Sequence, residues 1–446
     1  MTSKLTFACL SSDFNINLPS MEIITASCTL PMTNGAPIIE KGAIAIELSK
    51  IYAFGSLEEI RKKYPNAEVI SYENSVLMPG LINAHCHLDL IDFYDTSFND
   101  TEYVAKSNDF IKHIISSIEF KNEADPQKTI SGIQKGINRL IETGTTCVGN
   151  MTHFEGTFKL LRESGLRAIV FPEIFAGRSE AAQNRFEIAL ALVEKYTDAS
   201  HDRIRVGLAP YAPYLLSRNL LKIISQHAKE AGIQLQIHAA ESFAEMEFFF
   251  DSQGSIATEL FPSLGWQELP PSQHKTPVQY LSEINFLEAP VSIVGGLHLS
   301  NPDFSILMRY LARVIYCPNT NKTMKHGSFP YGKLREFGIP IGLGTDQWIS
   351  RKSFSIWEEM RIALQQGSTP IPTPRELVQM ATIGGARCLA LDHLIGTLEE
   401  GKKADYIIVH APKFTNGDDF YFNLVTKTES HHIKKVVVGG NILKSI

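Results

Sequence analysis

The feature that most constrains the fold is an alternation of short, β-rich apolar runs with amphipathic segments, which begins at residue 79. The stretch LLKIISQHAKEAG repeats apolar residues at three- and four-residue steps, which predicts a helix with Gly232 as its C-cap. Serial βα units predict an α/β chain closed into a (β/α)8 TIM barrel, with its chemistry at the C-terminal strand ends. Eight such runs are recognised, at residues 80–87, 145–151, 167–175, 204–211, 233–241, 291–299, 313–319 and 339–346.

The two ends of the chain have a different pattern, with short strands separated by turns. Neither end is long enough to bury a good core alone. Residues 1–78 and 392–446 are therefore predicted to pair as one small β-sandwich domain, and residues 79–391 to form the barrel domain. The long connection 242–290 is rich in aromatic residues and is predicted to be an active-site lid.

Composition excludes several classes of partner. A net charge of -6 and a pI near 6.2 give no general attraction for nucleic acid or for an anionic membrane surface. No run reaches the roughly 18 apolar residues of a membrane span. The six cysteines are scattered without CxxC spacing, which favours reduced thiols and a cytoplasmic protein. The expected partner is a small molecule, and the sequence leaves open whether the chain forms a homodimer.

Residues suited to a metal ion stand at the ends of several predicted strands. His85 and His87 in PGLINAHCHLDL are two residues apart, so on a strand they share one face. Alone, this pair is more typical of two packed strand histidines than of a metal site. His238 in QIHAAES and Asp346 in GLGTDQ end two further runs. Three imidazoles and a carboxylate at one barrel mouth predict a single divalent metal, with zinc as the default and iron or manganese as alternatives.

Motifs along the chain also resemble a known family. PGLINAHCHLDL, QIHAAES, YCPNTN, IGLGTDQ and GTLEEGKKADYIIV resemble the successive signatures of the amidohydrolase superfamily, specifically its cytosolic aminohydrolase branch. The resemblance covers nearly the whole chain and includes the split β-domain. It implies that His85, His87, His238 and Asp346 are the metal ligands and that Glu241 is the proton shuttle. Asp346 would also accept a second proton as ammonia leaves, which is general acid–base work.

Two departures from the family pattern affect the site. Gly295 stands where the branch usually carries a sixth-strand histidine that contacts the reacting centre. His298, three residues later, is the candidate catalytic substitute only if the strand end twists, and strand-end packing is its alternative role. Tyr211 replaces a usual substrate-binding histidine, and its phenol can still hydrogen-bond or stack on a base.

The substrate prediction depends on a narrower resemblance. NAHCHLDL followed by NDFIKHIIS, together with VFPEIF, resembles the aminodeoxyfutalosine deaminase group, with Asp89 for the family glutamate and His113 for its tryptophan. Asp89, Tyr211 and Glu173 are the candidate substrate-binding residues, and Asp89 would meet a ribose hydroxyl. The predicted function is hydrolytic deamination of an adenine-type nucleoside, with 6-amino-6-deoxyfutalosine of the menaquinone pathway favoured. The alternatives are deamination of methylthioadenosine, S-adenosylhomocysteine or adenosine, hydrolysis of a ring amide or halide, and nucleoside binding without turnover.

Overall fold

The central part of the chain forms a closed barrel of parallel strands. The computed structural model describes residues 21–33, 35–93, 109–175, 179–197, 202–347, 354–366, 370–411 and 418–446. Neighbouring barrel strands pair in parallel, and two single bridges, Leu208–Leu235 and Cys86–Asp346, close the ring. The predicted (β/α)8 barrel is confirmed. Its strands are β6 (Leu81–Cys86), β7 (Thr145–Thr152), β8 (Arg167–Ile174), β9 (Ile204–Val206) continued by β10 (Ala209–Pro210), β11 (Leu235–Ala239), β12 (Val291–Gly295), β13 (Arg313–Tyr316) and β14 (Ile341–Leu343).

Amphipathic helices cover the barrel strands. In α8 the Ser217 side chain accepts a hydrogen bond from the Leu220 N–H, and Gly232 ends the helix with a left-handed φ of 65°, as predicted. Leu221 and Ile224 on one face of this helix are fully buried against the barrel. The helical elements of this part are η1 (Leu88–Leu90), α4 (Phe110–Glu123), α5 (Pro126–Glu142), α6 (Gly156–Ser164), α7 (Ser179–Tyr196), α8 (Arg218–Ala231), α12 (Asn301–Arg309), α13 (Pro318–Thr323), α14 (Tyr331–Glu336), α15 (Ile356–Gln365), α16 (Pro374–Gln379), η4 (Met380–Gly384) and α17 (Gly385–Cys388).

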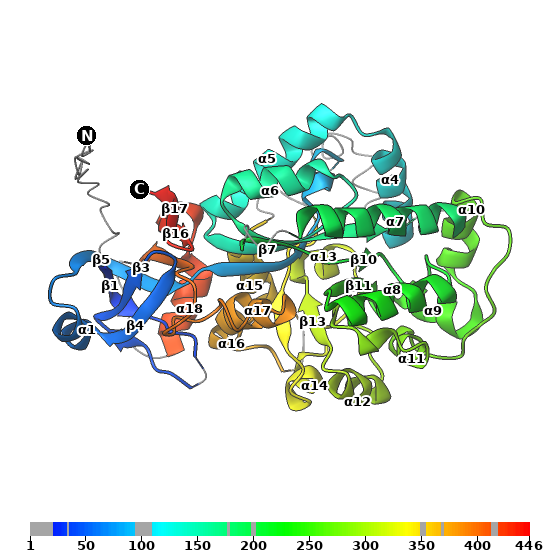
Figure 1. Ribbon diagram of the computed structural model, residues 1–446. Coiled ribbons are helices and arrows are strands. Elements are labelled where there is room, and N and C mark those ends of the chain that lie inside the picture. The colour runs from blue at the N-terminus through cyan, green and yellow to red at the C-terminus, as the bar shows by residue number, and fades with distance from the viewer. Residues whose placement is uncertain are drawn as a thin grey trace, which may run out of the picture.

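The connection 242–290 is largely helical and lies beside α4 at the right of Figure 1. Phe248, Phe249 and Phe261 are buried in the main core, whereas Phe243 is 65% exposed. Most of these aromatic side chains therefore serve packing, and the lid role of the connection stays a prediction. Its elements are α9 (Phe243–Asp251), the π-helix η2 (Ile256–Leu260), α10 (Phe261–Ser263), α11 (Pro277–Glu283) and η3 (Phe286–Glu288). None of the helices in the described ranges is long and apolar enough to cross a bilayer.

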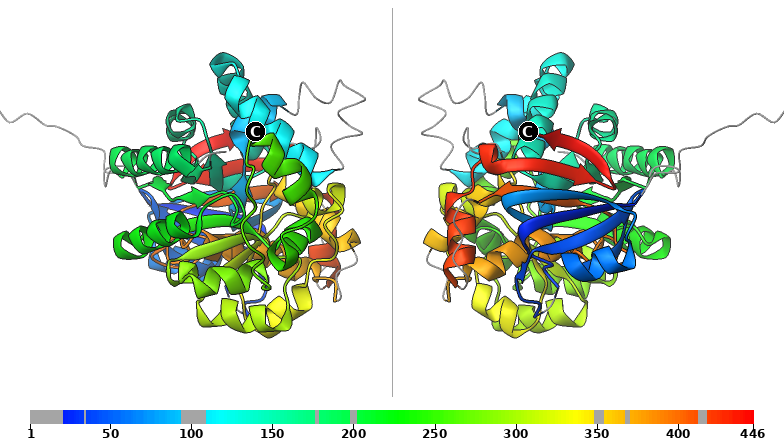
Figure 2. Two further views of the ribbon diagram at one scale, coloured as in Figure 1. Left: turned by 90° about the vertical axis from the view of Figure 1, so that its right-hand side faces the viewer. Right: turned by 90° about the vertical axis from the view of Figure 1, so that its left-hand side faces the viewer.

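Both chain ends contribute to a second sheet, at the left of Figure 1, and its blue and red strands lie side by side in the right panel of Figure 2. Its order is β17-β16-β15-β5-β1-β3-β4, with β2 on β1. The predicted β-domain from both ends is present, although hydrogen bonds join its strands into one sheet instead of two. Antiparallel pairing of β15 with β5 makes that continuity. The domain limits at 78/79 and 391/392 stay a prediction. The elements are β1 (Glu22–Thr29), β2 (Ile39–Glu40), β3 (Gly42–Glu47), β4 (Lys50–Ser56), α1 (Leu57–Lys63), β5 (Glu68–Pro79), β15 (Tyr406–His410), α18 (Asp418–Lys427), η5 (Ser430–His432), β16 (Ile433–Val438) and β17 (Asn441–Ser445).

A buried ion pair joins the two parts of the fold. Arg167, at the start of β8, donates to both carboxylate oxygens of Asp405, at 2.8 and 3.1 Å, and both side chains are almost fully buried. The Gly439 N–H also donates to this carboxylate at 2.7 Å. Because the pair connects the start of a barrel strand to the residue before β15, it fixes the position of the terminal sheet against the N-terminal end of the barrel.

Removing the arginine alone should destabilise the folded protein. Arg167→Ala leaves the Asp405 carboxylate buried without its cation, and we expect the free energy of unfolding to fall by about 3–5 kcal/mol. Urea denaturation measures the change. Lys195→Ala is the matched control, because Lys195 pairs with Glu155 on the exposed surface, where an ion pair contributes roughly 0–1 kcal/mol. Equal losses in the two variants would contradict the structural role of the buried pair.

Candidate metal centre

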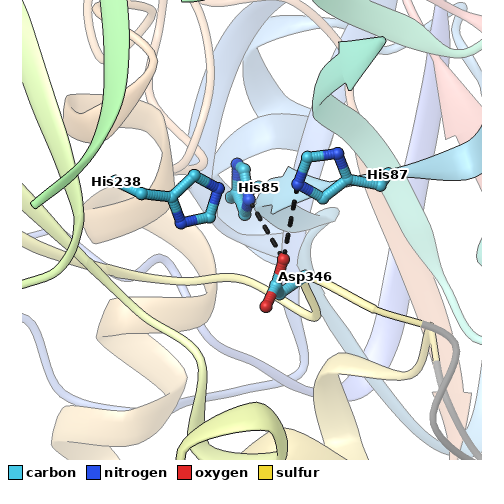
Figure 3. Close-up of side chains that lie close together, drawn as sticks. All are labelled: His85, His87, His238 and Asp346. Atoms are coloured by element: carbon cyan, nitrogen blue, oxygen red, sulfur yellow. Dashed lines mark ion pairs between the residues drawn. The ribbon is translucent and has the colours of Figure 1, made fainter. Parts of the chain in front are cut away.

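Four buried side chains converge at the C-terminal mouth of the barrel. His85 and His87 come from the end of β6, His238 from β11, and Asp346 from the segment after β14. One potential ligand atom of each lies within 4.8 Å of those of the other three. Figure 3 shows the three imidazoles and the carboxylate pointing toward one another. The strand ends therefore assemble the predicted ligand set from segments far apart in the sequence.

Hydrogen bonds fix the first of these imidazoles. His85 Nδ1 lies 3.0 Å from Gln236 Oε1, and Gln236 Nε2 donates to the Ala84 carbonyl at 2.8 Å. Since an amide oxygen only accepts, His85 Nδ1 carries the proton and Nε2 keeps its lone pair. The Asp346 backbone adds a clamp, because its N–H donates to the His85 carbonyl and its carbonyl accepts from the His87 N–H. Asp346 has a left-handed φ of 51° in this turn.

The polar atoms of the cluster fit a divalent cation. His85 Nε2, both ring nitrogens of His238 and Asp346 Oδ1 are buried without a hydrogen-bond partner, a rare situation that calls for a ligand. Asp346 Oδ1 lies 3.3 Å from His85 Nε2 and 3.5 Å from His87 Nε2. Burial and the neighbouring His85 hold the pKa of His87 well below its usual value. Burial alone would raise the pKa of Asp346, but the adjacent histidines hold it well below its usual range. A neutral imidazole and an ionised carboxylate are the forms that bind metal.

Glu241 lies beside the cluster. It follows His238 by three residues, and its Oε2 is 3.4 Å from His238 Nδ1. The Glu241 N–H donates to Glu245 Oε2 at 3.0 Å, which anchors the turn after β11. Burial, with the Glu241 charge, raises the pKa of Glu245 to about 8. The carboxyl of Glu245 is therefore mostly protonated at neutral pH.

Gly295 explains how Glu241 fits there. A Cβ atom at Gly295 would lie 2.8 Å from the Glu241 Cβ, and the glycine has a φ of 98°. Any larger residue in this backbone position would displace Glu241. The glycine that replaces the usual family histidine therefore leaves the space that Glu241 occupies.

Of the candidate substrate residues, Tyr211 lies beside His238, and Glu173 is paired with a lysine of α4. The Tyr211 ring packs against His238 with 5.1 Å between ring centroids. Glu173 accepts from Lys121 Nζ at 2.6 and 2.7 Å, and Lys121 Nζ lies 5.2 Å from the Tyr211 ring centroid. Sequence reasoning missed Lys121, although it follows the buried Ile114 by seven residues and so lies on the same helical face.

Asp89 is buried beside the end of β7. Its Oδ2 accepts from Thr152 Oγ1 and from the His153 N–H, each at 2.8 Å, and lies 2.6 Å from His153 Nδ1. Burial alone would raise the pKa of Asp89, but His153 holds it well below its usual range. Asp89 Oδ1 has no hydrogen-bond partner. The ribose contact stays a prediction, and Oδ1 is the oxygen available for it.

His298 does not join the ligand set. It is half-buried, and its Nε2–H donates to the His326 carbonyl at 2.9 Å. His326 itself was missed, because a single histidine in the segment after YCPNTN carries no pattern. Its side chain is buried, and its Nε2 has no hydrogen-bond partner. The structure thus brings a histidine near the site that the sequence did not single out.

Gln236 provides a test of the ligand geometry. Gln236→Met removes the acceptor that orients His85, and the loss of such an orienting partner typically weakens metal affinity about 10–100-fold. Competition with a fluorescent chelator measures the Kd of zinc. Gln234→Met is the matched control, because Gln234 lies directly before β11, two residues from Gln236, and bonds instead to Ser292 and to the Cys388 carbonyl. Similar zinc Kd values for both variants would contradict this role of Gln236.

Comparison with known proteins agrees with this geometry. The family model of the amidohydrolase family matches residues 76–443. The 5-methylthioadenosine/S-adenosylhomocysteine deaminase of Desulfitobacterium hafniense is 27% identical over 431 residues, covering 95% of this chain and 93% of that protein. The aminodeoxyfutalosine deaminase of a Nitratiruptor species is 26% identical over 406 residues, covering 90% of this chain and 95% of that protein.

A solved structure shares the fold over nearly the full length. The crystal structure of an adenosine deaminase from Xanthomonas campestris with bound zinc superposes with a TM-score of 0.79 at 20% identity, and covers 96% of this chain and 93% of that chain. With the family match across the barrel and much of the terminal sheet, the chain is a hydrolase that acts on carbon–nitrogen bonds. It belongs to the amidohydrolase family.

Proposed function

We propose that this chain is a metal-dependent aminohydrolase that releases ammonia from an adenine-type nucleoside. The observation that carries the proposal is the buried cluster of His85, His87, His238 and Asp346 with the Glu241 carboxylate beside it. This cluster provides ligands for one ion and a separate acid–base group within reach of it. Deamination by water needs both functions.

Glu241 and Asp346 have separate proton-transfer roles in the proposed reaction. When bound, a divalent metal supplies Lewis-acid activation of water at neutral pH. Glu241 accepts a proton from the attacking water and delivers it to a ring nitrogen of the substrate, because its carboxylate lies beside the cluster, 3.4 Å from His238 Nδ1. Water adds at the carbon that bears the amino group. Asp346 then takes the second proton from the added hydroxyl and passes it to the amino group, so that the carbon–nitrogen bond breaks and ammonia leaves. Both carboxylates are regenerated at the end of the cycle.

Zinc is the proposed ion. Three imidazoles and one carboxylate are ligands that zinc prefers in catalytic sites that keep a position for water. The Xanthomonas campestris adenosine deaminase contains zinc, which supports the same ion here. Iron and manganese suit the same donor types, so metal analysis of the purified protein is part of the test.

The proposed substrate class is an adenine-type nucleoside with a modified 5′ side. Support comes from the Desulfitobacterium and Nitratiruptor relatives, which are a 5-methylthioadenosine/S-adenosylhomocysteine deaminase and an aminodeoxyfutalosine deaminase. Within this class, the motifs after His87 favour aminodeoxyfutalosine. In the structure, the Tyr211 ring beside His238 offers an aromatic surface for a base.

A substrate panel tests the proposal. Metal-replete protein is incubated with aminodeoxyfutalosine, methylthioadenosine, S-adenosylhomocysteine and adenosine, and ammonia is measured with product mass. The expected result is ammonia together with a nucleoside product about one mass unit heavier, because an amino group is exchanged for a hydroxyl. Tight nucleoside binding without ammonia would instead identify a binding protein. Turnover of a ring amide or halide without ammonia would identify the other hydrolase class.

A further inference from the structure

His326 is a buried imidazole that the proposed mechanism does not yet use. Its side chain is 5% exposed, and Nε2 has no hydrogen-bond partner. The ring packs edge-on against Phe110 of α4, with 4.6 Å between centroids. Asn321 in the same segment has both side-chain polar atoms buried without partners. Buried polar atoms without hydrogen-bond partners indicate that these side chains line a ligand-binding site.

Burial and nearby charges act on the pKa of His326 in opposite directions. Burial lowers the pKa of His326, and the largest opposing influence is the Glu241 carboxylate, followed among the acids by Asp346. The neutral ring, with Nε2 lacking a partner, can donate or accept a hydrogen bond.

A chain of hydrogen bonds links His326 to the Glu241 turn. The His298 N–H donates to the Ala240 carbonyl at 2.9 Å, directly before Glu241. The His298 ring then donates from Nε2 to the His326 carbonyl at 2.9 Å. The His326 N–H donates in turn to the Asn321 carbonyl at 3.0 Å. His298 thus ties the segment that carries His326 to the segment that carries the acid.

Strand β12 provides no side chain on this flank of Glu241. It ends at Gly295, where even a Cβ atom would lie 2.8 Å from the Glu241 Cβ. A polar contact beside the acid must therefore come from another element, and His326 is a buried imidazole available for it.

We propose that His326 contacts the substrate beside Glu241, and that His298 is a positioning residue that holds His326 in place. The inference rests on the proposed function for the identity of the ligand. It assigns the contact to the segment after α13, and it gives His298 an indirect role in place of the direct one expected from the sequence.

Four variants and a double mutant test the pair, with aminodeoxyfutalosine and methylthioadenosine as probes. His326→Ala should lower kcat/KM about 100–1000-fold, the loss typical of a donor at the reacting centre, with metal content unchanged. His326→Gln should recover at least tenfold, because its amide nitrogen can replace Nε2. His298→Ala should show a smaller loss, and His298→Gln should recover it by donating to the same carbonyl. His298→Ala combined with His326→Ala should be no worse than His326→Ala alone.

Two results would overturn the inference. If the activity of His326→Ala is within threefold of that of the parent protein, His326 does not contact the substrate. If the losses in the double mutant are additive, His298 does not act by positioning His326. His274→Ala is the control, because this histidine is exposed. If His326→Ala does not fold, the recovery of His298→Ala by His298→Gln decides the question. If the parent protein releases no ammonia, the proposed function fails separately, and the inference is judged by Kd, where His326→Ala must weaken nucleoside binding at least tenfold to support it.

Discussion

Glu241→Gln should lower the rate of ammonia release about 100- to 10,000-fold, the range that a positioned acid–base group contributes, while the metal content stays at the parent level. The glutamine keeps the size of the side chain but cannot accept a proton from water or deliver one to the ring. His238 Nδ1 lies 3.4 Å from the replaced carboxylate, and the substitution alters none of the four residues of the cluster. Steady-state kinetics with ammonia detection and elemental analysis of the same sample measure both quantities.

Glu247→Gln is the matched control for this experiment. Glu247 lies on α9, six residues further along the chain, and its side chain is exposed. The same change of charge there should leave kcat within twofold of the parent value. Unchanged turnover in Glu241→Gln would reject its role as proton shuttle, even if the metal site is confirmed.

Removal of the metal should abolish turnover and lower the stability of the fold. An ion that binds only the native state adds about 4 kcal/mol to the free energy of unfolding at a free concentration 1,000 times its Kd. Chelated protein should therefore unfold at lower urea concentration, and added zinc should restore both stability and activity. Denaturation curves of the chelated and reconstituted protein measure the difference.

His238→Ala distinguishes zinc binding at the cluster from a general effect of zinc on protein stability. This variant lacks one ligand from β11, so added zinc should produce much less stabilisation than in the parent protein. His274→Ala, which removes an exposed histidine, should respond to zinc as the parent does. A chelator that changes neither stability nor turnover of the parent protein would contradict a structural ion at the cluster.

The fold and the ligand cluster were predictable because both depend on local patterns. The alternation of apolar runs and amphipathic helices defines a (β/α)8 barrel, and a barrel brings its strand ends to one mouth. His85, His238 and Asp346 end such runs, so their convergence required no knowledge of distant contacts. The strand pairing within the terminal β-domain could not be predicted from local patterns, because pairing between β5 and β15 joins residues more than 300 positions apart.

The remaining site residues depend on tertiary contacts that no short pattern contains. Lys121 pairs with Glu173 across the gap between α4 and β8, and His326 lies in an irregular segment. The twist at Gly295, with a φ of 98°, changes where the residues after β12 point. Strand alternation therefore could not place His298, whose ring instead reaches the His326 carbonyl.

The pairing of β15 with β5 has a consequence for how the protein is made. Strand β5 ends at Pro79 and β6, which carries His85, begins at Leu81, so the two form nearly one continuous stretch. Until Tyr406–His410 have left the ribosome, β5 has an open edge, and such edges favour aggregation of nascent chains. Completion of this early segment must wait for one of the last strands synthesised, so truncations before residue 406 should yield insoluble protein even though the barrel sequence is intact.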